Sequence, residues 1–403
     1  MKLPNNPFIG PRPFERGERL FGRDTDLFNL LDLLIAERLV MFYSPSGAGK
    51  SSLIEAALIP RLEKKRFTVL RVNRFVQTGF QEGSASAQGE NLYIANLIHS
   101  LEKQRKKIGL PDTAPATDTS LEEYWTGLDT GQEEGKTNKY LLIFDQFEEI
   151  ITRNSLDIAA KREFFRQLGR LLQNRRIWAL FALGEDYIAS LDPFLESIPT
   201  RLKTRYRLDL LGTEEASEVI QQTVEQGGKS FADEGIVEQL VRDLSMIKIQ
   251  KFDGSFTSKP GNYVEPIYLQ VTCRRLWSRL RPETDLIGPD DLSRSGSVNH
   301  ALADYYEEHI QKIAADDMAT ERTIREWFSE QLISSASIRL QVIKEKDMSG
   351  DLDNALISKL IDAYLVRRDD RSGVTWFELA HDRLVQPIVE SNRHWFNKQL
   401  APV

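Results

Sequence analysis

RLVMFYSPSGAGKSSLI, residues 38–54, is the stretch of sequence that decides the fold. An apolar run, residues 39–43, leads without a break into a small Gly-containing turn and then into a segment that is compatible with a helix. A strand, loop and helix in this order form a phosphate-binding loop (P-loop), where backbone N–H groups surround phosphates at the positive end of a helix. The stretch therefore predicts a nucleotide site. A plain Gly/Ser turn is the simpler alternative, which the register of Gly, Lys and Ser disfavours.

Each residue type in this loop has an expected role. Gly47 and Gly49 carry no Cβ, so the backbone can curl closely around a di- or triphosphate. Lys50 is expected to reach the β and γ phosphates, and Ser51 to offer its hydroxyl to Mg²⁺. Ser44 stands where the pattern usually has its first Gly. The residues expected to hold the nucleotide here are Ser44, Pro45, Ser46, Gly47, Ala48, Gly49, Lys50, Ser51 and Ser52.

A second chemical motif is KYLLIFDQFEEI, residues 139–150. Four apolar residues place Asp145 at the end of a strand, where a Walker B carboxylate orders the Mg²⁺ shell. Glu148 and Glu149 follow within one turn, where a carboxylate can polarise the attacking water. We expect Glu149 to be the base and Glu148 a supporting carboxylate, although two adjacent glutamates leave the choice open. With Lys50, they are the predicted catalytic residues. The alternative is a buried strand that ends in an acidic helix start.

The segments around these motifs indicate the topology. A strand candidate that begins at Phe67 lies between the two motifs, so we expect the sheet to insert a strand between the P-loop strand and the Walker B strand. The P-loop helix is expected to end near Pro60. Another strand, residues 177–183, is followed by Gly184, where many P-loop ATPases place a polar or basic sensor of the γ-phosphate. A further strand is expected over residues 206–210, preceded by two arginines that could approach a phosphate, Arg201 and Arg205.

Upstream of the P-loop, Phe21, Gly22 and Arg23 precede a helix for which Asp24 is the expected N-cap. Many ATPases of the AAA+ and related groups contact adenine at this place. An ordinary turn with an exposed Arg explains the same residues equally well, so both interpretations stay open.

Composition sets outer bounds on the class of protein. A chain of 403 residues with 41% apolar and 28% charged residues is typical of two or three globular domains. The net charge of −7 argues against a general nucleic-acid or membrane surface. A single cysteine, Cys273, excludes an internal disulfide framework, fits a reducing cytoplasm and is expected in the core. No apolar run is long enough to span a membrane, and no signal sequence is evident, so we expect a cytoplasmic protein.

The predicted fold class is α/β: a P-loop NTPase core of the AAA+-like kind with a parallel sheet, followed by a helical lid domain and a winged-helix domain. Helices dominate from Thr213 onward, and Pro266 begins an apolar helix. Two strand-like runs, residues 364–368 and 374–379, flank a charged turn and suggest the wing. The expected boundaries are 1–17 for a Pro-rich extension, 18–212 for the core, 213–315 for the lid, 316–390 for the winged helix and 391–403 for a helical tail.

The order FGR, SPSGAGKS, LLIFDQFEE and FELAHDRLVQPI resembles the STAND class of signal-transducing ATPases, particularly its bacterial branch, related to NACHT and apoptosome-type ATPases. In such relatives a winged-helix His contacts the β-phosphate of ADP, and His381 occupies the matching position. Pro266 matches a lid proline near adenine. The chain departs from the pattern at Ser44, and at Gly184, where bacterial relatives commonly have Arg. Loss of that Arg would weaken sensing of the γ-phosphate, so slow or impaired hydrolysis is expected even if the nucleotide still binds.

The resemblance also implies a switch in which ADP bridges the P-loop domain and the winged helix. Exchange for ATP would open the protein and allow self-association, with signalling or antiphage defence as output. The sensor and effector parts usual in the class are not found in this chain. The competing reading is a nucleic-acid-acting ATPase that binds DNA through wing arginines such as Arg367, Arg368 and Arg371, against which stand Asp369 and Asp370. A third reading is a catalytically inactive scaffold that binds ADP.

Overall fold

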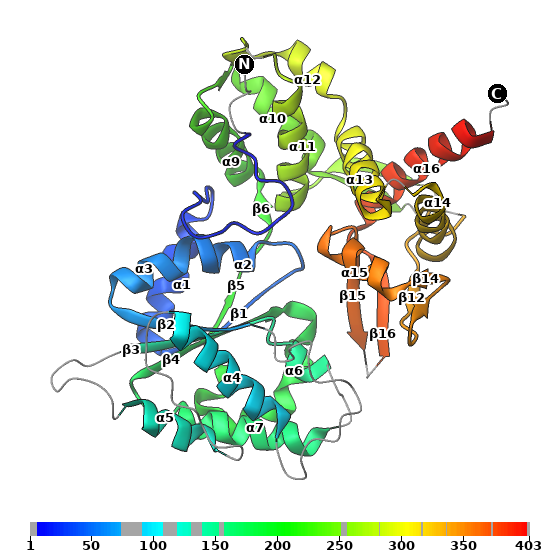
Figure 1. The fold of residues 1–403 in the computed structure, drawn as a ribbon. Helices are drawn as coiled ribbons and strands as arrows, with labels where there is room; N and C mark the ends of the chain where they lie inside the picture. The colour runs from blue at the N-terminus through cyan, green and yellow to red at the C-terminus, as the bar shows by residue number, and fades with distance from the viewer. Residues whose placement is uncertain are drawn as a thin grey trace. The chain divides into compact units, whose positions relative to one another are not determined.

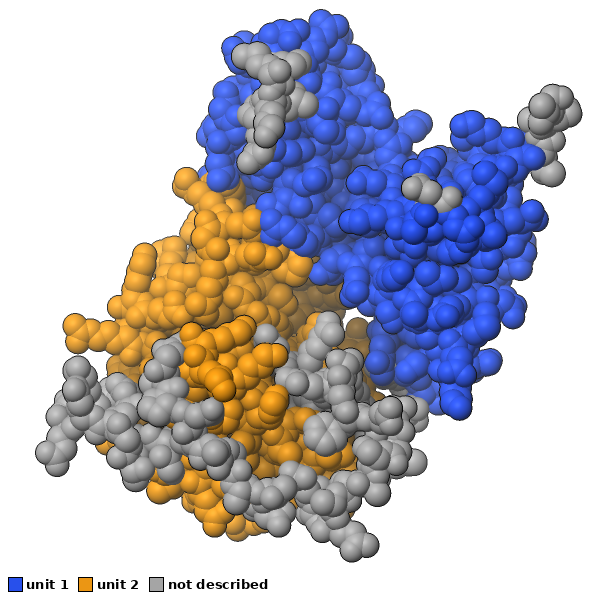
Figure 2. All heavy atoms as spheres, viewed as in Figure 1, with its two compact units in different colours: residues 1–12, 211–403 blue, residues 13–210 orange. Residues whose placement is uncertain are grey.

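The chain forms two compact units, residues 13–210 and residues 1–12 together with 211–403 (Figure 2). It therefore passes between the units twice: at the first crossing, residues 12–13, and at the second crossing, residues 210–211. The computed structural model describes residues 6–73, 91–107, 119–129, 139–152, 157–250, 256–281, 283–315, 317–335, 337–371 and 374–400.

Unit 13–210 is built on a five-stranded sheet in the order β2-β3-β4-β1-β5, and all of its pairings are parallel. A strand does lie between the P-loop and Walker B strands, as predicted, but it is β4. The strand on which the prediction rested, β2, lies at the edge of the sheet beside β3. Parallel strands that are buried on both faces read as continuous apolar runs, which is why β1, β3 and β4 were recognisable in the sequence. The strands are β1 Leu39–Ser44, β2 Phe67–Asn73, β3 Lys139–Asp145, β4 Ile177–Gly184 and β5 Arg205–Arg207.

Helices cover both faces of this sheet (Figure 1). Side chains alternate along each strand, so Leu142 and Phe144 join the core beneath one helical layer while Leu141 and Ile143 join the other. The first layer contains α4 Leu92–Lys107, α5 Leu121–Asp129 and α7 Ile158–Leu171. The second contains α1 Asp24–Glu37 and the P-loop helix, residues 50–64, which is made of α2 Lys50–Ser52, the π-helical η1 Leu53–Leu58 and α3 Ile59–Lys64.

Three local predictions for this unit were wrong. The P-loop helix continues past Pro60 to Lys64, because the change from π to α hydrogen bonding places Pro60 in the first turn of α3, where a missing N–H is tolerated. Asp24 is the first residue of α1 and not its N-cap, which is Arg23. The strand expected at residues 206–210 ends at Arg207, although the Leu208 N–H still donates to the Tyr43 carbonyl at 2.9 Å.

The other unit begins with helices, as predicted. Pro266 opens α11 in the position where its missing N–H costs nothing, and Cys273 is buried on the same helix. The N-terminal segment packs on α11, because the Arg274 side chain donates to the Phe8 carbonyl at 3.1 Å and Phe8 is buried. The helices are α9 Thr213–Gln226, α10 Glu234–Leu244, α11 Pro266–Arg279, α12 Pro289–Ser295 and α13 Val298–Ala314. The short strand pairs are β6 Leu211–Gly212 with β10 Tyr263–Val264, β7 Ser230–Phe231 with β11 Leu286–Ile287, and β8 Met246–Gln250 with β9 Phe256–Pro260.

Its C-terminal part combines helices with a three-stranded antiparallel sheet in the order β12-β16-β15. The predicted hairpin is thus present, while the winged-helix description of residues 316–390 stays a prediction. The helices are α14 Met318–Trp327 with η5 Phe328–Leu332, α15 Asn354–Asp362, and α16 Val385–Leu400 after the short η6 Asp382–Leu384. The strands are β12 Gln341–Ile343, β15 Val366–Arg371 and β16 Val374–Leu379, with a separate pair β13 Met348–Ser349 and β14 Leu352–Asp353.

A fully buried arginine ties this C-terminal part together. The Arg325 guanidinium on α14 pairs with Glu321 at 2.8 Å and donates to the Asn392 side chain on α16 at 3.0 Å. It also lies over the rings of Tyr306 on α13 and Trp395 on α16. These contacts satisfy a charge that would be costly to bury alone. Across the described ranges, no helix has both the length and the apolar character that a membrane span requires.

Candidate nucleotide site

The P-loop follows β1 and has the backbone that its glycines predict. Gly47 has φ of 78° and Gly49 has φ of 99°, a left-handed region in which an L side chain is strained. A Cβ added to Gly49 would meet nothing within 4 Å, so the requirement there is for backbone conformation and not for space. Substitution at Gly49 would therefore distort the loop itself.

Ser44 and Lys50 contact each other across the loop. Ser44 is fully buried at the end of β1, and its Oγ accepts a hydrogen bond from Lys50 Nζ at 2.7 Å. Its hydroxyl also donates to the Pro45 carbonyl at 2.7 Å. The departure from Gly at this position thus supplies a polar contact that holds the lysine over the loop.

Lys50 is half-buried among acidic groups. Burial lowers the pKa of its ammonium group, while the carboxylates of Glu148, Asp145, Glu185 and Asp186 act in the opposite direction. Attraction from these carboxylates therefore helps to keep Lys50 charged. A charged Lys50 at this position suits the binding of an anionic phosphate chain.

The predicted metal ligands, Ser51 and Asp145, contact each other. Ser51 Oγ donates to Asp145 Oδ2 at 3.2 Å, which brings a hydroxyl and a buried carboxylate together beside the loop. Oxygen donors of this kind suit Mg²⁺, which usually takes one or two carboxylates and completes its shell with substrate phosphates and water. Among the described residues no group of three or more His, Cys, Asp or Glu side chains is arranged to hold a metal ion. The residues present fit Mg²⁺ bound together with a nucleotide.

Sequence reasoning missed Arg71 on β2. Its Nη2 donates to Asp145 Oδ2 at 2.7 Å, and its Nη1 pairs with Glu55 in the π-helical part of the P-loop helix. The signal was a single charged residue inside the otherwise mostly apolar strand FTVLRVN. Its partner Asp145 is 74 residues further along the chain, so no local pattern revealed the pair.

The turn after Asp145 presents the two glutamates. Gln146 adopts φ of 57°, and the Phe147 N–H donates to the Ala182 carbonyl of β4 at 2.9 Å, which fixes the turn against the sheet. Glu149 then begins the short helix α6, Glu149–Thr152. The turn places Glu148 before that helix and directly after the anchored Phe147.

Glu148 has the environment of a general base. One of its carboxylate oxygens is buried with no hydrogen-bond partner in the part of the chain that the structure describes. Burial raises the pKa of Glu148 to about 7, while the charge of Lys50 acts to lower it. A carboxylate with a pKa near neutrality is suited to accept a proton from water. The choice between Glu148 and Glu149 stays a prediction. Both carboxylates have one buried oxygen, so it is the raised pKa that favours Glu148.

Arg23 lies beside the P-loop and connects the loop to two other segments of the unit. Its Nη2 donates to the Ala48 carbonyl of the loop at 2.9 Å and to the Asp209 carbonyl at 2.8 Å, and its Nη1 pairs with Asp26 at 2.9 Å. The prediction of an exposed Arg is wrong, because Arg23 is only 8% exposed. Phe21 is buried and Gly22 has φ of 69°, and their contact with adenine stays a prediction.

Gly184 ends β4 directly opposite Ser44 in the register of the sheet. A Cβ at this position would approach the Tyr187 ring to 3.2 Å, so an Arg here would require that ring to shift. The short helix η2, Glu185–Tyr187, follows at once. Arg207 at the end of β5 pairs with Glu185 at 3.1 Å and so lies near the place of the absent sensor.

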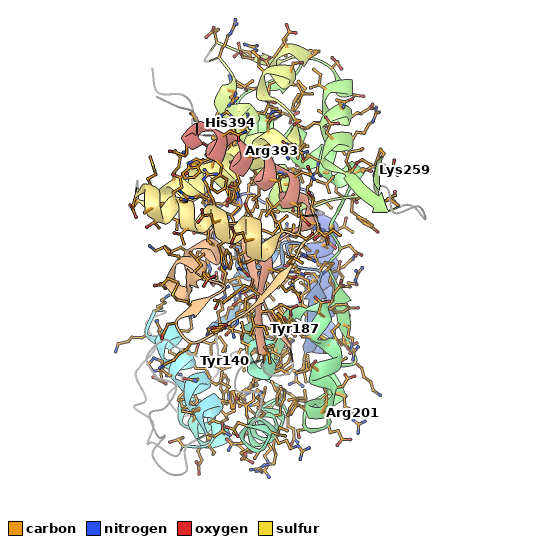
Figure 3. The ribbon with its side chains drawn as sticks, turned by 90° about the vertical axis from the view of Figure 1, so that its right-hand side faces the viewer. Tyr140, Tyr187, Arg201, Lys259, Arg393 and His394 are labelled. Carbon is orange, nitrogen blue, oxygen red and sulfur yellow. The ribbon has the colours of Figure 1, made fainter. Side chains whose placement is uncertain are left out.

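The two arginines considered from the sequence lie elsewhere. Arg201 is exposed at the surface of its unit, where it pairs with Glu196 at 3.6 Å (Figure 3). Arg205 pairs with Asp192 at 3.9 Å. Both contacts are surface ion pairs of small energetic value.

Pro266 and His381 belong to the other unit, where the fold brings their surroundings together. His381 Nδ1 lies 2.8 Å from the carboxylate of Glu265, the residue before Pro266. The His381 ring also packs edge-on against Tyr268 of α11, with ring centroids 5.4 Å apart. The Arg383 guanidinium lies over the Tyr268 ring, 5.6 Å from the ring centre. Helix α11 and the segment after β16 are thus in direct contact.

Solved structures similar to this chain include a Walker-type ATPase of Pyrococcus abyssi, with 13% identity, a TM-score of 0.46, and coverage of 94% of this chain and 98% of that one. The ORC2 protein of Aeropyrum pernix, solved in ADPNP–ADP complexes, has 12% identity, a TM-score of 0.47, and coverage of 96% and 98%. CDC6P from Pyrobaculum aerophilum has 14% identity, a TM-score of 0.43, and coverage of 95% and 97%. No curated protein matches the chain.

A family model described as Novel STAND NTPase 1 matches residues 7–397. The match includes the P-loop, Asp145, the two glutamates, Pro266 and His381. Since it extends over nearly the whole sequence, the chain belongs to the Novel STAND NTPase 1 family.

Proposed function

We propose that this NTPase is an ATP/ADP-binding molecular switch, in which slow hydrolysis of ATP is coupled to conformational opening and self-association. The observation that carries the proposal is that hydrogen bonds connect the P-loop and its helix to both crossings between the units. A ligand shifts a conformational equilibrium only if it binds the two states differently. Contacts from the nucleotide loop to both crossings provide a physical route for such a difference.

The first crossing is attached to the P-loop helix. The N–H of Phe14, the second residue of the unit, donates to Ser52 Oγ at 3.2 Å. Arg16 pairs with Glu55 at 3.6 Å and with Glu63 at 3.0 Å on the same helix. Any displacement of the P-loop helix therefore acts on residues 13–16.

The second crossing is attached to the loop itself through Arg23. Its Nη2 joins the Ala48 carbonyl to the Asp209 carbonyl, and Asp209 lies one residue before Leu210, where the unit ends. Phosphates bound by the loop N–H groups would change the position or the rigidity of Ala48. Because the Arg23 guanidinium donates to both carbonyls, that change would be transmitted to Asp209, next to the second crossing.

The arrangement of residues predicted to face the phosphates supports the proposal of hydrolysis. Lys50 would exchange Ser44 Oγ for the β and γ phosphates, and Ser51 with Asp145 would hold Mg²⁺, which neutralises charge on the phosphates when bound. Glu148 would take the proton of the attacking water. The absence of a basic side chain at Gly184 removes one stabilising contact to the γ-phosphate, which is the reason for proposing a slow rate.

In the unit that contains residues 211–403, we propose that His381 distinguishes ADP from ATP. Its pairing with Glu265 links it to α11, the helix that Pro266 begins. Signalling in bacteria, including defence against phage, is the output that the family resemblance suggests. DNA binding gains no support from two of the wing arginines, and the third, the Arg371 side chain, lies outside the part of the chain that the structure describes. Arg367 pairs with the buried Glu378, and Arg368 donates to Thr375 at 3.3 Å, so both are engaged within their own hairpin.

Replacement of Lys50 with Ala is expected to weaken binding of both ADP and ATP by about tenfold to a hundredfold, since charge-assisted hydrogen bonds contribute about 1.5–3 kcal/mol each. Calorimetric titration of the full chain measures this. Lys64→Ala, an exposed lysine at the end of the same helix, is the matched control and should bind as the wild type does. Retained affinity in Lys50→Ala would refute the P-loop assignment.

ATP hydrolysis is expected to require ionised Glu148. Because burial raises its pKa to about 7, the carboxylate loses its proton as pH rises through that value, and the rate should increase with it. One pH unit below the pKa, about one-tenth of the groups are ionised and the rate should be about a tenth of its plateau. Glu148→Gln should lower the plateau by about 10²–10³-fold and abolish this pH dependence. Glu149→Gln is the matched variant, and a larger loss there would transfer the role of base to Glu149.

His381→Ala is expected to raise the self-associated fraction in the presence of ADP, since it removes the proposed reader of the closed state. Light scattering coupled to size exclusion, at several protein concentrations, gives the mass distribution. His309→Ala provides the control, because the His309 ring contacts Tyr305 of its own helix. An unchanged distribution in His381→Ala with ADP bound would reduce His381 to a packing role.

A further inference from the structure

We propose that Arg71 is a built-in cation on the metal side of the nucleotide site, which partly replaces Mg²⁺ and makes binding of a nucleoside diphosphate only weakly dependent on it. This inference rests on the proposed function. It concerns a residue that no motif of the site includes. The evidence is the placement of its guanidinium between two buried or half-buried carboxylates.

The sheet directs Arg71 toward the P-loop helix. Val69, two residues earlier on β2, belongs to the core beneath that helix, while Leu70 and Val72 belong to the opposite core. Side chains two apart share a face, so Arg71 projects on the P-loop side. Glu55 from the π-helical turn of the P-loop helix approaches from that same side and pairs with Arg71 Nη1.

Arg71 binds the atom of Asp145 that also contacts Ser51. Asp145 Oδ2 accepts from Arg71 Nη2 at 2.7 Å and from Ser51 Oγ at 3.2 Å. Ser51 and Asp145 are the groups proposed to hold Mg²⁺, so a full positive charge already lies against one of them. The Arg71 Nε is buried and has no hydrogen-bond partner within the described ranges. One N–H donor of the guanidinium is therefore not used by the protein there.

The charges determine how Arg71 should affect each ligand. A guanidinium next to Asp145 attracts an anionic phosphate chain, whether or not a metal ion is present. It repels Mg²⁺ and competes with it for the carboxylate. Arg71 should therefore tighten Mg²⁺-free binding of ADP more than it tightens binding of ADP with Mg²⁺. By linkage, removal of Arg71 should make the affinity for ADP depend more strongly on Mg²⁺, and the affinity for Mg²⁺ depend more strongly on ADP.

The test compares the dissociation constant of ADP measured with excess EDTA to that measured with excess Mg²⁺, using the full chain. For Arg71→Gln this ratio should rise about tenfold over the wild type, which corresponds to about 1.4 kcal/mol of added coupling. Arg71→Lys keeps the charge and should keep a ratio near that of the wild type. Mn²⁺ binding to the ADP complex, followed by electron paramagnetic resonance, should become tighter in Arg71→Gln.

Two further variants separate this role from a structural one. Arg16→Gln loses the other arginine paired with Glu55, but this arginine is 52% exposed and 3.6 Å from the carboxylate, so its loss should change the ratio much less than Arg71→Gln does. Glu55→Gln removes a negative charge from the same cluster and should lower the ratio, opposite to Arg71→Gln, so the inference can be tested even if Arg71→Gln does not fold. A ratio that stays constant in Glu55→Gln and the folded Arg71 variants, with both affinities weakened equally, would overturn it. A wild-type chain that binds ADP under neither condition would instead refute the proposed function.

Discussion

The P-loop of this protein depends on the buried guanidinium of Arg23. It contacts the carbonyl of Ala48 in the loop, the carbonyl of Asp209 after the last strand, and the carboxylate of Asp26 on α1. Asp26 in turn accepts a hydrogen bond from the Tyr206 hydroxyl on β5 at 2.8 Å. One side chain thus fixes the loop relative to the sheet and the first helix. Removing a partner from such a buried pair typically costs about 3–5 kcal/mol.

The same contact explains why a phosphate-binding loop can control more than phosphate binding. Ala48 lies where the loop closes, and Asp209 lies beside the second crossing. The first crossing is held by the Phe14 N–H on Ser52 Oγ, one residue after the proposed Mg²⁺ ligand Ser51. The two places where the chain passes between its units are therefore mechanically connected to residues 48–52. This arrangement suits a switch, in which a small change at the nucleotide must be transmitted along the chain.

The central part of the fold could be predicted because its signals are local. The apolar run before Ser44 and the one before Asp145 define buried parallel strands, and the left-handed glycines of the loop follow from its motif. The roles of Arg23 and Arg71 could not be predicted in this way. Arg23 reaches Asp209 across 186 residues, and Arg71 reaches Asp145 across 74, so only the folded sheet brings each pair together. The helix end expected at Pro60 was wrong because a π turn is not visible in residue type.

Charge compensation gives the site its chemical character. Lys50 and Arg71 lie among carboxylates, one of which, Glu148, has a pKa raised to about 7 by burial. A bound nucleotide would add its own negative charge to these groups, and Mg²⁺ would add positive charge. The protein contributes two cations to the proposed site, and Glu148, whose pKa burial raises, is the carboxylate best suited to activate water.

Hydrogen exchange of the full chain, measured with ADP and with a non-hydrolysable ATP analogue, tests the central claim most directly. The account predicts that both nucleotides protect the P-loop amides. It also predicts that the two nucleotides produce different exchange rates at residues 13–16 and at residues 208–212, which contain the Phe14 donor and the second crossing. Equal exchange at both crossings with the two nucleotides, despite a protected P-loop, would contradict the account.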